Sequence, residues 1–268
     1  MRKLLKRALI AAATVFAVAG IVLCIVYAVN PYKVRRLWWR LRTAPDVYVD
    51  RLKGCPYTKE GYDGIDVSKH NGVIKWNEVA KDERIRFVYI RATVGNGIVD
   101  RRYRQNVNGA RKVGLKVGSY HFFTSKSSAT AQFLYFRNVV KKEEQDLVPV
   151  LDVEEDGIKG KWQGTQLQDS VRAFAEMVKK HYGKYPIIYS NEHFYNTELG
   201  ARFNRYFLFI ANYQNTPYVD ANGKNNIWQY SCSGHLHGIG ERVDLSRFEK
   251  GTSLEDIKLL GEGCRLGR

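Results

Sequence analysis

Short segments rich in Val, Ile, Tyr and Phe alternate with longer amphipathic segments along most of the chain after residue 60. Strands are expected at 64–68, 87–93, 116–123, 147–154, 185–190, 206–213, 226–231 and 242–248. Helices are expected at 76–82, 103–113, 127–142, 165–182 and about 192–204. This alternation predicts an α/β fold built on a parallel sheet with right-handed crossovers. Eight strands further predict a closed barrel, irregular because the last three strands are joined by loops without full helices.

The N-terminal residues follow a different pattern. Residues 8–29 form an uncharged run of 22 residues, preceded by Arg2, Lys3, Lys6 and Arg7. A run of this length can cross a bilayer, and it is longer than the apolar part of a typical cleaved signal peptide. We therefore expect residues 1–30 to be a transmembrane signal anchor, with a cleaved signal peptide as the alternative. The remaining expected parts are a basic juxtamembrane linker at 31–60, the β/α-barrel domain at 61–250 and a C-terminal tail at 251–268.

The formal net charge of +16 is unevenly distributed. Residues 1–53 carry +9, which leaves +7 for the domain. Attraction to anionic lipid explains the first group, and the second suits an anionic polymer such as the bacterial cell wall. We find no nucleic-acid motif and expect no nucleic-acid partner.

The four cysteines give a mixed indication. Cys24 lies in the apolar run, and no spacing typical of a zinc site occurs. Cys55 and Cys264 lie on either side of the domain, and domain termini are often close together. We expect a Cys55–Cys264 disulfide in an oxidising compartment, with free thiols as the alternative. Cys232 is expected to be a small core residue.

The apolar segment at 147–151 ends in two carboxylates, Asp152 and Glu154. Side chains alternate along a strand, so both carboxylates point to one face. Gathering ionised carboxylates in a partly buried place is costly, and paired carboxylates are typical of glycosidases. Asp66 and Asp244 also lie in predicted strands. The C-terminal ends of barrel strands converge, so we expect these four carboxylates at one mouth.

Seven motifs occur in the order in which one enzyme family carries them. They are Gly64-Ile65-Asp66-Val67-Ser68, Tyr120-His121-Phe122, Pro149-Val150-Leu151-Asp152-Val153-Glu154, Pro186-Ile187-Ile188-Tyr189, Ile210-Ala211-Asn212-Tyr213, Trp228-Gln229-Tyr230-Ser231 and Val243-Asp244-Leu245-Ser246-Arg247-Phe248. Together they resemble the glycoside hydrolase family 25 muramidases, or lysozymes, over the whole domain. The resemblance implies a flattened, irregular β/α barrel that hydrolyses the β-1,4 bond between N-acetylmuramic acid and N-acetylglucosamine in peptidoglycan.

The resemblance also implies roles for the four carboxylates. Glu154 matches the catalytic general acid, and Asp152, Asp66 and Asp244 match the acidic residues around it. We expect Asp152 to stay ionised and to orient the 2-acetamido group of the substrate for attack on the anomeric carbon. The alternative is that Asp66 or Asp244 activates a water. One departure is Val94, which stands where the family commonly has Glu.

Other polar and aromatic residues of the strand ends are candidates for substrate binding. They are Tyr189, Tyr213, Asn212, His121 and Gln229. Aromatic rings can stack on sugars, and the amides can bond to hydroxyl groups or to the carboxylates. The structural alternatives are barrel packing for the tyrosines and a hydrogen-bonded core position for His121.

Three rival functions are weaker. A metal enzyme would use His121 with the carboxylates, but no metal-ligand spacing occurs, so no metal or cofactor is expected. A chitinase-like site would need an Asp at Val150. A catalytically inactive, membrane-tethered glycan-binding module would have little need for four carboxylates. We expect a monomer that acts on peptidoglycan strands outside the cytoplasm while anchored in the membrane.

Overall fold

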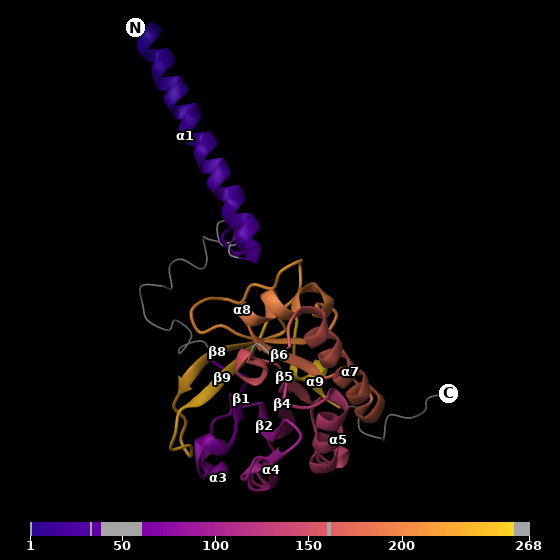
Figure 1. Cartoon of the computed structure of the whole chain (residues 1–268). Helices are drawn as coiled ribbons and strands as arrows, with labels where there is room; N and C mark the ends of the chain where they lie inside the picture. Colours follow the sequence, from indigo (N-terminus) through magenta and orange to yellow (C-terminus); the bar gives the residue numbers. More distant parts are fainter. Residues whose placement is uncertain (1, 33, 39–60, 160–161, 260–268) are drawn as a thin grey trace, which may run out of the picture. The chain divides into compact units, whose positions relative to one another are not determined.

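The computed structural model describes residues 2–32, 34–38, 61–159 and 162–259. The chain divides into two units, residues 1–49 and 50–268. The first contains the helix α1 (Arg2–Val29) (Figure 1). Among the residues that the structure describes, no helix combines the length and apolar character needed to cross a membrane, so the expected transmembrane anchor is not supported. The expected Cys55–Cys264 disulfide lies outside the described residues.

The second unit is built on one sheet that closes on itself. Its strands are β1 (Gly64–Val67), β2 (Phe87–Val94), β3 (Ile98–Val99), β4 (Lys116–Phe122), β5 (Val150–Asp152), β6 (Ile187–Asn191), β7 (Leu208–Ala211), β8 (Ile227–Gly234) and β9 (Val243–Phe248). Their order is β1-β9-β8-β7-β6-β5-β4-β2-β3, and β1 also pairs with β2. The closure makes an eight-stranded barrel, with β3 as a short hairpin partner of β2. The predicted barrel is therefore confirmed.

The last barrel strand corrects the expectation of an all-parallel sheet. β9 runs antiparallel to both of its neighbours, β8 and β1. The connection from β8 to β9 is too short for a crossover, and a short connection can only join antiparallel neighbours. The other barrel pairs are parallel.

Helices cover the outside of the barrel (Figure 1). The α-helices of this unit are α3 (Trp76–Val79), α4 (Tyr103–Lys112), α5 (Ala129–Val139), α6 (Glu155–Ile158), α7 (Gly164–Tyr182), α8 (Glu192–Phe194) and α9 (Leu254–Ile257). Ser128 caps α5 through its side chain, and Gly183 ends α7 in the left-handed conformation. The predicted helix at 192–204 forms only as short turns, and Gly200, at φ +63°, interrupts it.

Alternation along the strands separates two apolar cores. The larger one lies between the strands and the helices, and contains Ile65, Val88, Leu151 and Ile188. The smaller one consists of residues of opposite parity, such as Phe87, Tyr89, Val150 and Ile187, and fills the barrel interior. Ile257 of α9 packs into this interior core, and Leu147 pairs with Lys258. Side chains that follow the interior parity toward the C-terminal strand ends therefore enter a cavity above this core.

Candidate active site

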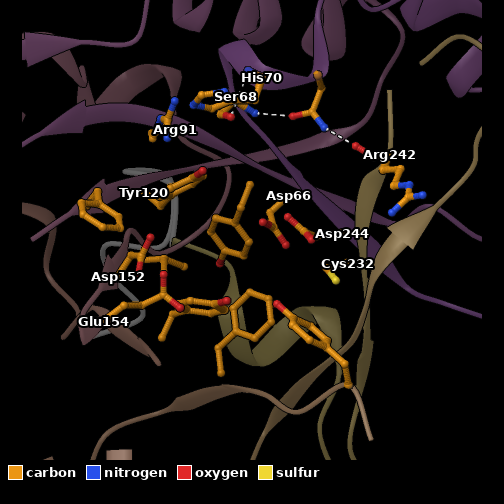
Figure 2. A pocket seen from close by; sticks show the side chains of 17 residues that line it. Asp66, Ser68, His70, Arg91, Tyr120, Asp152, Glu154, Cys232, Arg242 and Asp244 are labelled. Atoms are coloured by element: carbon orange, nitrogen blue, oxygen red, sulfur yellow. Dashed lines mark hydrogen bonds between the residues drawn. The ribbon is translucent and has the colours of Figure 1, made fainter. Parts of the chain in front are cut away.

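A cavity of about 360 Å³ opens at the C-terminal ends of the parallel strands. Figure 2 shows its lining, in which all four predicted carboxylates take part. Asp66 lies on β1, Asp244 on β9, Asp152 ends β5 and Glu154 follows two residues later. Residues that are far apart in the sequence are thus brought into one hollow by closure of the barrel.

Asp66 and Asp244 form a pair on neighbouring antiparallel strands. They are direct partners in the register of β1 and β9, and their carboxyl groups lie side by side (Figure 2). Burial raises the pKa of Asp66 well above its usual value, and the charge of Asp244 raises it further. Burial also raises the pKa of Asp244, whereas a hydrogen bond from Asp66 lowers it. Two adjacent buried carboxylates cannot both ionise easily, so burial and mutual repulsion favour a state in which the pair keeps one proton.

Asp152 and Glu154 lie on another wall of the same cavity (Figure 2). Val153, between them, points into the outer core, as strand alternation requires. Burial raises the pKa of Glu154 to about 7, with further contributions from the charges of Asp156 and Asp244. A carboxyl group with this pKa keeps its proton near neutral pH and can donate it.

Asp152 is buried, and its Oδ1 has no hydrogen-bond partner among the described residues. Burial and the neighbouring charge of Glu154 raise its pKa well above the usual value, while Arg91 acts in the opposite direction. Burial therefore opposes the expectation that Asp152 stays ionised in the free protein. The Asp152 side chain lines the cavity, and its carboxyl group has hydrogen-bonding capacity that the described residues leave unused.

Gln229 connects one carboxylate to two aromatic side chains. Its Nε2 donates to Asp66 Oδ2 at 2.8 Å. Its Oε1 accepts from the hydroxyl groups of Tyr189 at 2.8 Å and Tyr213 at 2.7 Å. Both tyrosines line the cavity, and Tyr213 is 47% exposed. These three predicted residues therefore lie at the site, with Gln229 bonded to a carboxylate.

The arrangement agrees with comparisons with known proteins. The sequence model of glycosyl hydrolases family 25 matches residues 65–239. The chain belongs to glycosyl hydrolase family 25. It is 37% identical to the uncharacterized protein YegX of Escherichia coli (strain K12) over 75% of this chain and 74% of that protein. It is 31% identical to the autolytic lysozyme of Clostridium acetobutylicum over 75% of this chain and 60% of that protein.

Solved structures agree with this assignment. The bacterial lysozyme from Streptomyces coelicolor superposes with a TM-score of 0.66 at 29% identity, covering 74% of this chain and 95% of that chain. The family 25 member described here is thus a glycoside hydrolase of the muramidase type.

His121 does not lie in the cavity of this family 25 hydrolase. It is fully buried on the outside of the barrel, where its ring stacks on Phe174 with centroids 4.9 Å apart. Thr93 Oγ1 lies 2.7 Å from Nδ1, and Gln132 Oε1 lies 3.2 Å from Nε2. Burial lowers the pKa of His121 to about 4, so the ring is neutral. The candidate binding role is wrong, because Tyr120 occupies the inward position and the next residue must point outward.

Asn212 also lies outside the cavity lining. Its side-chain Nδ2 donates to the buried Glu192, and its Oδ1 accepts from the backbone N–H groups of Gln214 and Asn215 at 3.0 Å. Trp228 Nε1 donates to the Asn212 carbonyl at 2.8 Å. Asn212 therefore holds the loop that carries Tyr213.

Cys232 is exposed and lines the cavity, so the expected core position is wrong. The pairing of β8 with β9 shifts register between Gln229 and Ser231 and again between Ser231 and Gly234. Such irregularities turn side chains away from simple alternation. The thiol consequently points into the hollow near Asp244 (Figure 2).

Three basic residues of the cavity were not among the predicted site residues. Arg91 on β2 lines the wall, and its Nε bonds to the buried Asp100 at 3.0 Å. Arg91 shares the inward parity of Tyr89, which the sequence could have indicated. His70 and Arg242 come from connecting segments without such a signal. Within the described part of the chain, no cluster of His, Cys, Asp and Glu is suited to hold a metal ion.

Proposed function

We propose that this hydrolase cleaves the β-1,4 bond between N-acetylmuramic acid and N-acetylglucosamine in peptidoglycan, with Glu154 as the general acid. The observation that supports this role best is the burial of Glu154 in the cavity, which raises its pKa to about 7. Glycoside cleavage needs a proton for the leaving oxygen and negative charge near the developing oxocarbenium ion. In our proposal Glu154 supplies the proton and the Asp66–Asp244 pair supplies the charge.

Asp152 has a separate part in the proposed reaction. Its Oδ1 lacks a hydrogen-bond partner among the described residues and belongs to a side chain that lines the cavity. We assign the Asp152 carboxyl group to the N–H of the 2-acetamido group, whose carbonyl oxygen then attacks the anomeric carbon as the bond to the leaving oxygen breaks. Asp152 can play this orienting role in either protonation state, because a neutral carboxyl group also has an acceptor oxygen.

The substrate also determines where the proposed activity takes place. Peptidoglycan lies outside the cytoplasm, so we propose that the domain acts there, as a monomer. The net charge of +7 after residue 53 supports contact with an anionic polymer.

The test is digestion of purified peptidoglycan by the full-length protein, with mass spectrometry of the soluble fragments. We expect fragments with N-acetylmuramic acid at the new reducing end. The matched variant Glu154→Gln should release almost none. Fragments that end in N-acetylglucosamine would contradict the proposed bond. A wild-type protein that sediments with the wall and releases no reducing ends would instead be a glycan-binding module.

A further inference from the structure

The side-chain oxygen of Gln229 uses both of its hydrogen-bond acceptor positions. Its Oε1 accepts two hydroxyl groups, from Tyr189 at 2.8 Å and from Tyr213 at 2.7 Å. An amide oxygen has two lone pairs, so both are occupied. Burial raises the pKa of both tyrosines, and each therefore keeps the proton that it donates. The two hydroxyl groups thus determine which end of the amide faces them.

The other end of the amide must then face Asp66. Its Nε2 donates to Asp66 Oδ2 at 2.8 Å. A reversed amide would place a carbonyl oxygen against the carboxylate and would leave both hydroxyl groups without their acceptor. Such a rearrangement is costly for part-buried groups. The tyrosines therefore hold an N–H donor against Asp66.

The protonation of the Asp66–Asp244 pair depends on the N–H donor that Gln229 places next to Asp66. The two residues are register partners on β1 and β9, and their carboxyl groups lie side by side (Figure 2). Because like charges on neighbouring groups repel each other, the second proton of the pair is harder to remove than the first. A neighbouring N–H donor stabilises the negatively charged pair, which holds one proton, relative to the neutral pair, which holds two.

We propose that Gln229 is a positioning residue that, held by the hydroxyl groups of Tyr189 and Tyr213, keeps one negative charge on the Asp66–Asp244 pair. The two tyrosine hydroxyl groups thereby act through the amide, in addition to any contact of their rings with sugar. The consequence for catalysis rests on the proposed function, because the charge of Asp244 is one of the causes that keep Glu154 protonated.

Other titratable and charged groups also face the pair, and they are unchanged in the test below. Tyr89 and Arg91 lie on β2, Tyr120 on β4, Asp152 on β5 and Glu154 two residues after it. His70 lies in the segment after β1, Cys232 on β8 and Arg242 in the segment before β9.

The test compares Tyr189→Phe, Tyr213→Phe and the double variant with wild type. Tyr185→Phe is the matched control, since its hydroxyl group bonds to Glu176 on the surface. The full-length proteins carry ¹³C-labelled aspartate, and the carboxyl signals are titrated by NMR without substrate. In the double variant the amide can turn, so we expect the lower apparent pKa of the pair to rise by about one unit. Each single variant should move it much less, because the remaining hydroxyl group still holds the amide.

Activity gives an independent reading of the same shift. The acid limb of the kcat/KM profile should move to higher pH in the double variant. Gln229→Met, which lacks the N–H, should produce the same shift even where the double variant does not fold. An unmoved titration in both of these variants would overturn the proposal. Single shifts that add up to the double shift, or a raised KM without a pH shift, would also overturn it.

The titration separates this inference from the proposed function. A shifted titration in a protein that leaves peptidoglycan intact would contradict the muramidase reaction and support the role of Gln229. An unshifted titration in an active muramidase would do the reverse.

Discussion

Two groups of buried polar side chains lie near each other on opposite sides of the barrel wall. Outside the sheet, His121 bonds to Thr93 and Gln132, and Gln132 also bonds to the backbone of Thr124 in both directions. Inside, Asp152 keeps an oxygen without a hydrogen-bond partner among the described residues. A polar group that is buried and fully bonded stabilises a fold, whereas a buried group with unused capacity is available to a ligand.

On β4, two consecutive residues lie on opposite sides of the barrel wall. Tyr120 points into the cavity and His121 points to the helices. A shift in the pairing of β2 with β4 between Arg91 and Thr93 brings Thr93 opposite His121, on the outside. Both side chains are buried, so what distinguishes Asp152 from His121 is the unpartnered carboxyl oxygen, and not the degree of burial.

The largest effect on activity is expected from Glu154→Gln in the cavity. This substitution removes the proposed acid and keeps the shape of the side chain. Activity on peptidoglycan should fall by about 10²–10⁴-fold, the usual contribution of a general acid. Release of reducing ends by purified protein measures this loss. Thermal unfolding of the same sample checks that the fold is intact. Retention of more than about a tenth of the activity would remove Glu154 from the acid role.

The same substitution should change how stability depends on pH. The pKa of Glu154 is about 7 in the folded protein against a usual value of 4.5. An acid whose pKa is raised on folding contributes stability that is full below its unfolded pKa and is lost as pH rises through its folded pKa. Between about pH 4.5 and 7, wild type should therefore lose up to about 3 kcal/mol relative to Glu154→Gln. Urea unfolding of both proteins across this range measures the difference, and parallel curves would contradict it.

His121→Phe should lower stability and leave activity nearly unchanged, whereas Glu154→Gln should abolish most of the activity. It keeps a ring against Phe174 but removes both hydrogen bonds, so the free energy of unfolding should fall by about 2 kcal/mol. The kcat/KM of the folded protein should change little, because the ring lies outside the cavity. Chemical denaturation and steady-state kinetics on the same sample measure the two effects. A selective loss of kcat with unchanged stability would return His121 to the site.

A smaller effect is expected from alkylation of Cys232, which is exposed in the cavity. A bulky maleimide on this thiol should lower activity by about tenfold, because it obstructs the substrate. Cys232→Ser treated in the same way is the control, since Cys24 is also a free and exposed thiol. Equal inhibition of both proteins would show that the effect comes from another cysteine.

Much of the site could be predicted because barrel closure and strand alternation are strong constraints. The four carboxylates lie at or just after strands, and a closed barrel brings such positions together. Alternation also identifies Tyr189 as inward. The same rule, applied to Tyr120, would have placed His121 outside.

Other features depend on interactions that a sequence pattern does not contain. The exposure of Cys232 follows from register shifts between β8 and β9. His70 and Arg242 reach the cavity from connecting segments, where no periodicity exists. The antiparallel direction of β9, in contrast, could have been predicted, because the short connection after β8 is visible in the sequence.

The central claim is that the cavity keeps Glu154 protonated near neutral pH. The most direct test is an NMR titration of the ¹³C-labelled glutamate carboxyl groups in the full-length protein, with Glu154→Gln to assign the signal. The account predicts an apparent pKa of about 7 for Glu154. A value near 4.5, the ordinary one for a glutamate, would contradict it.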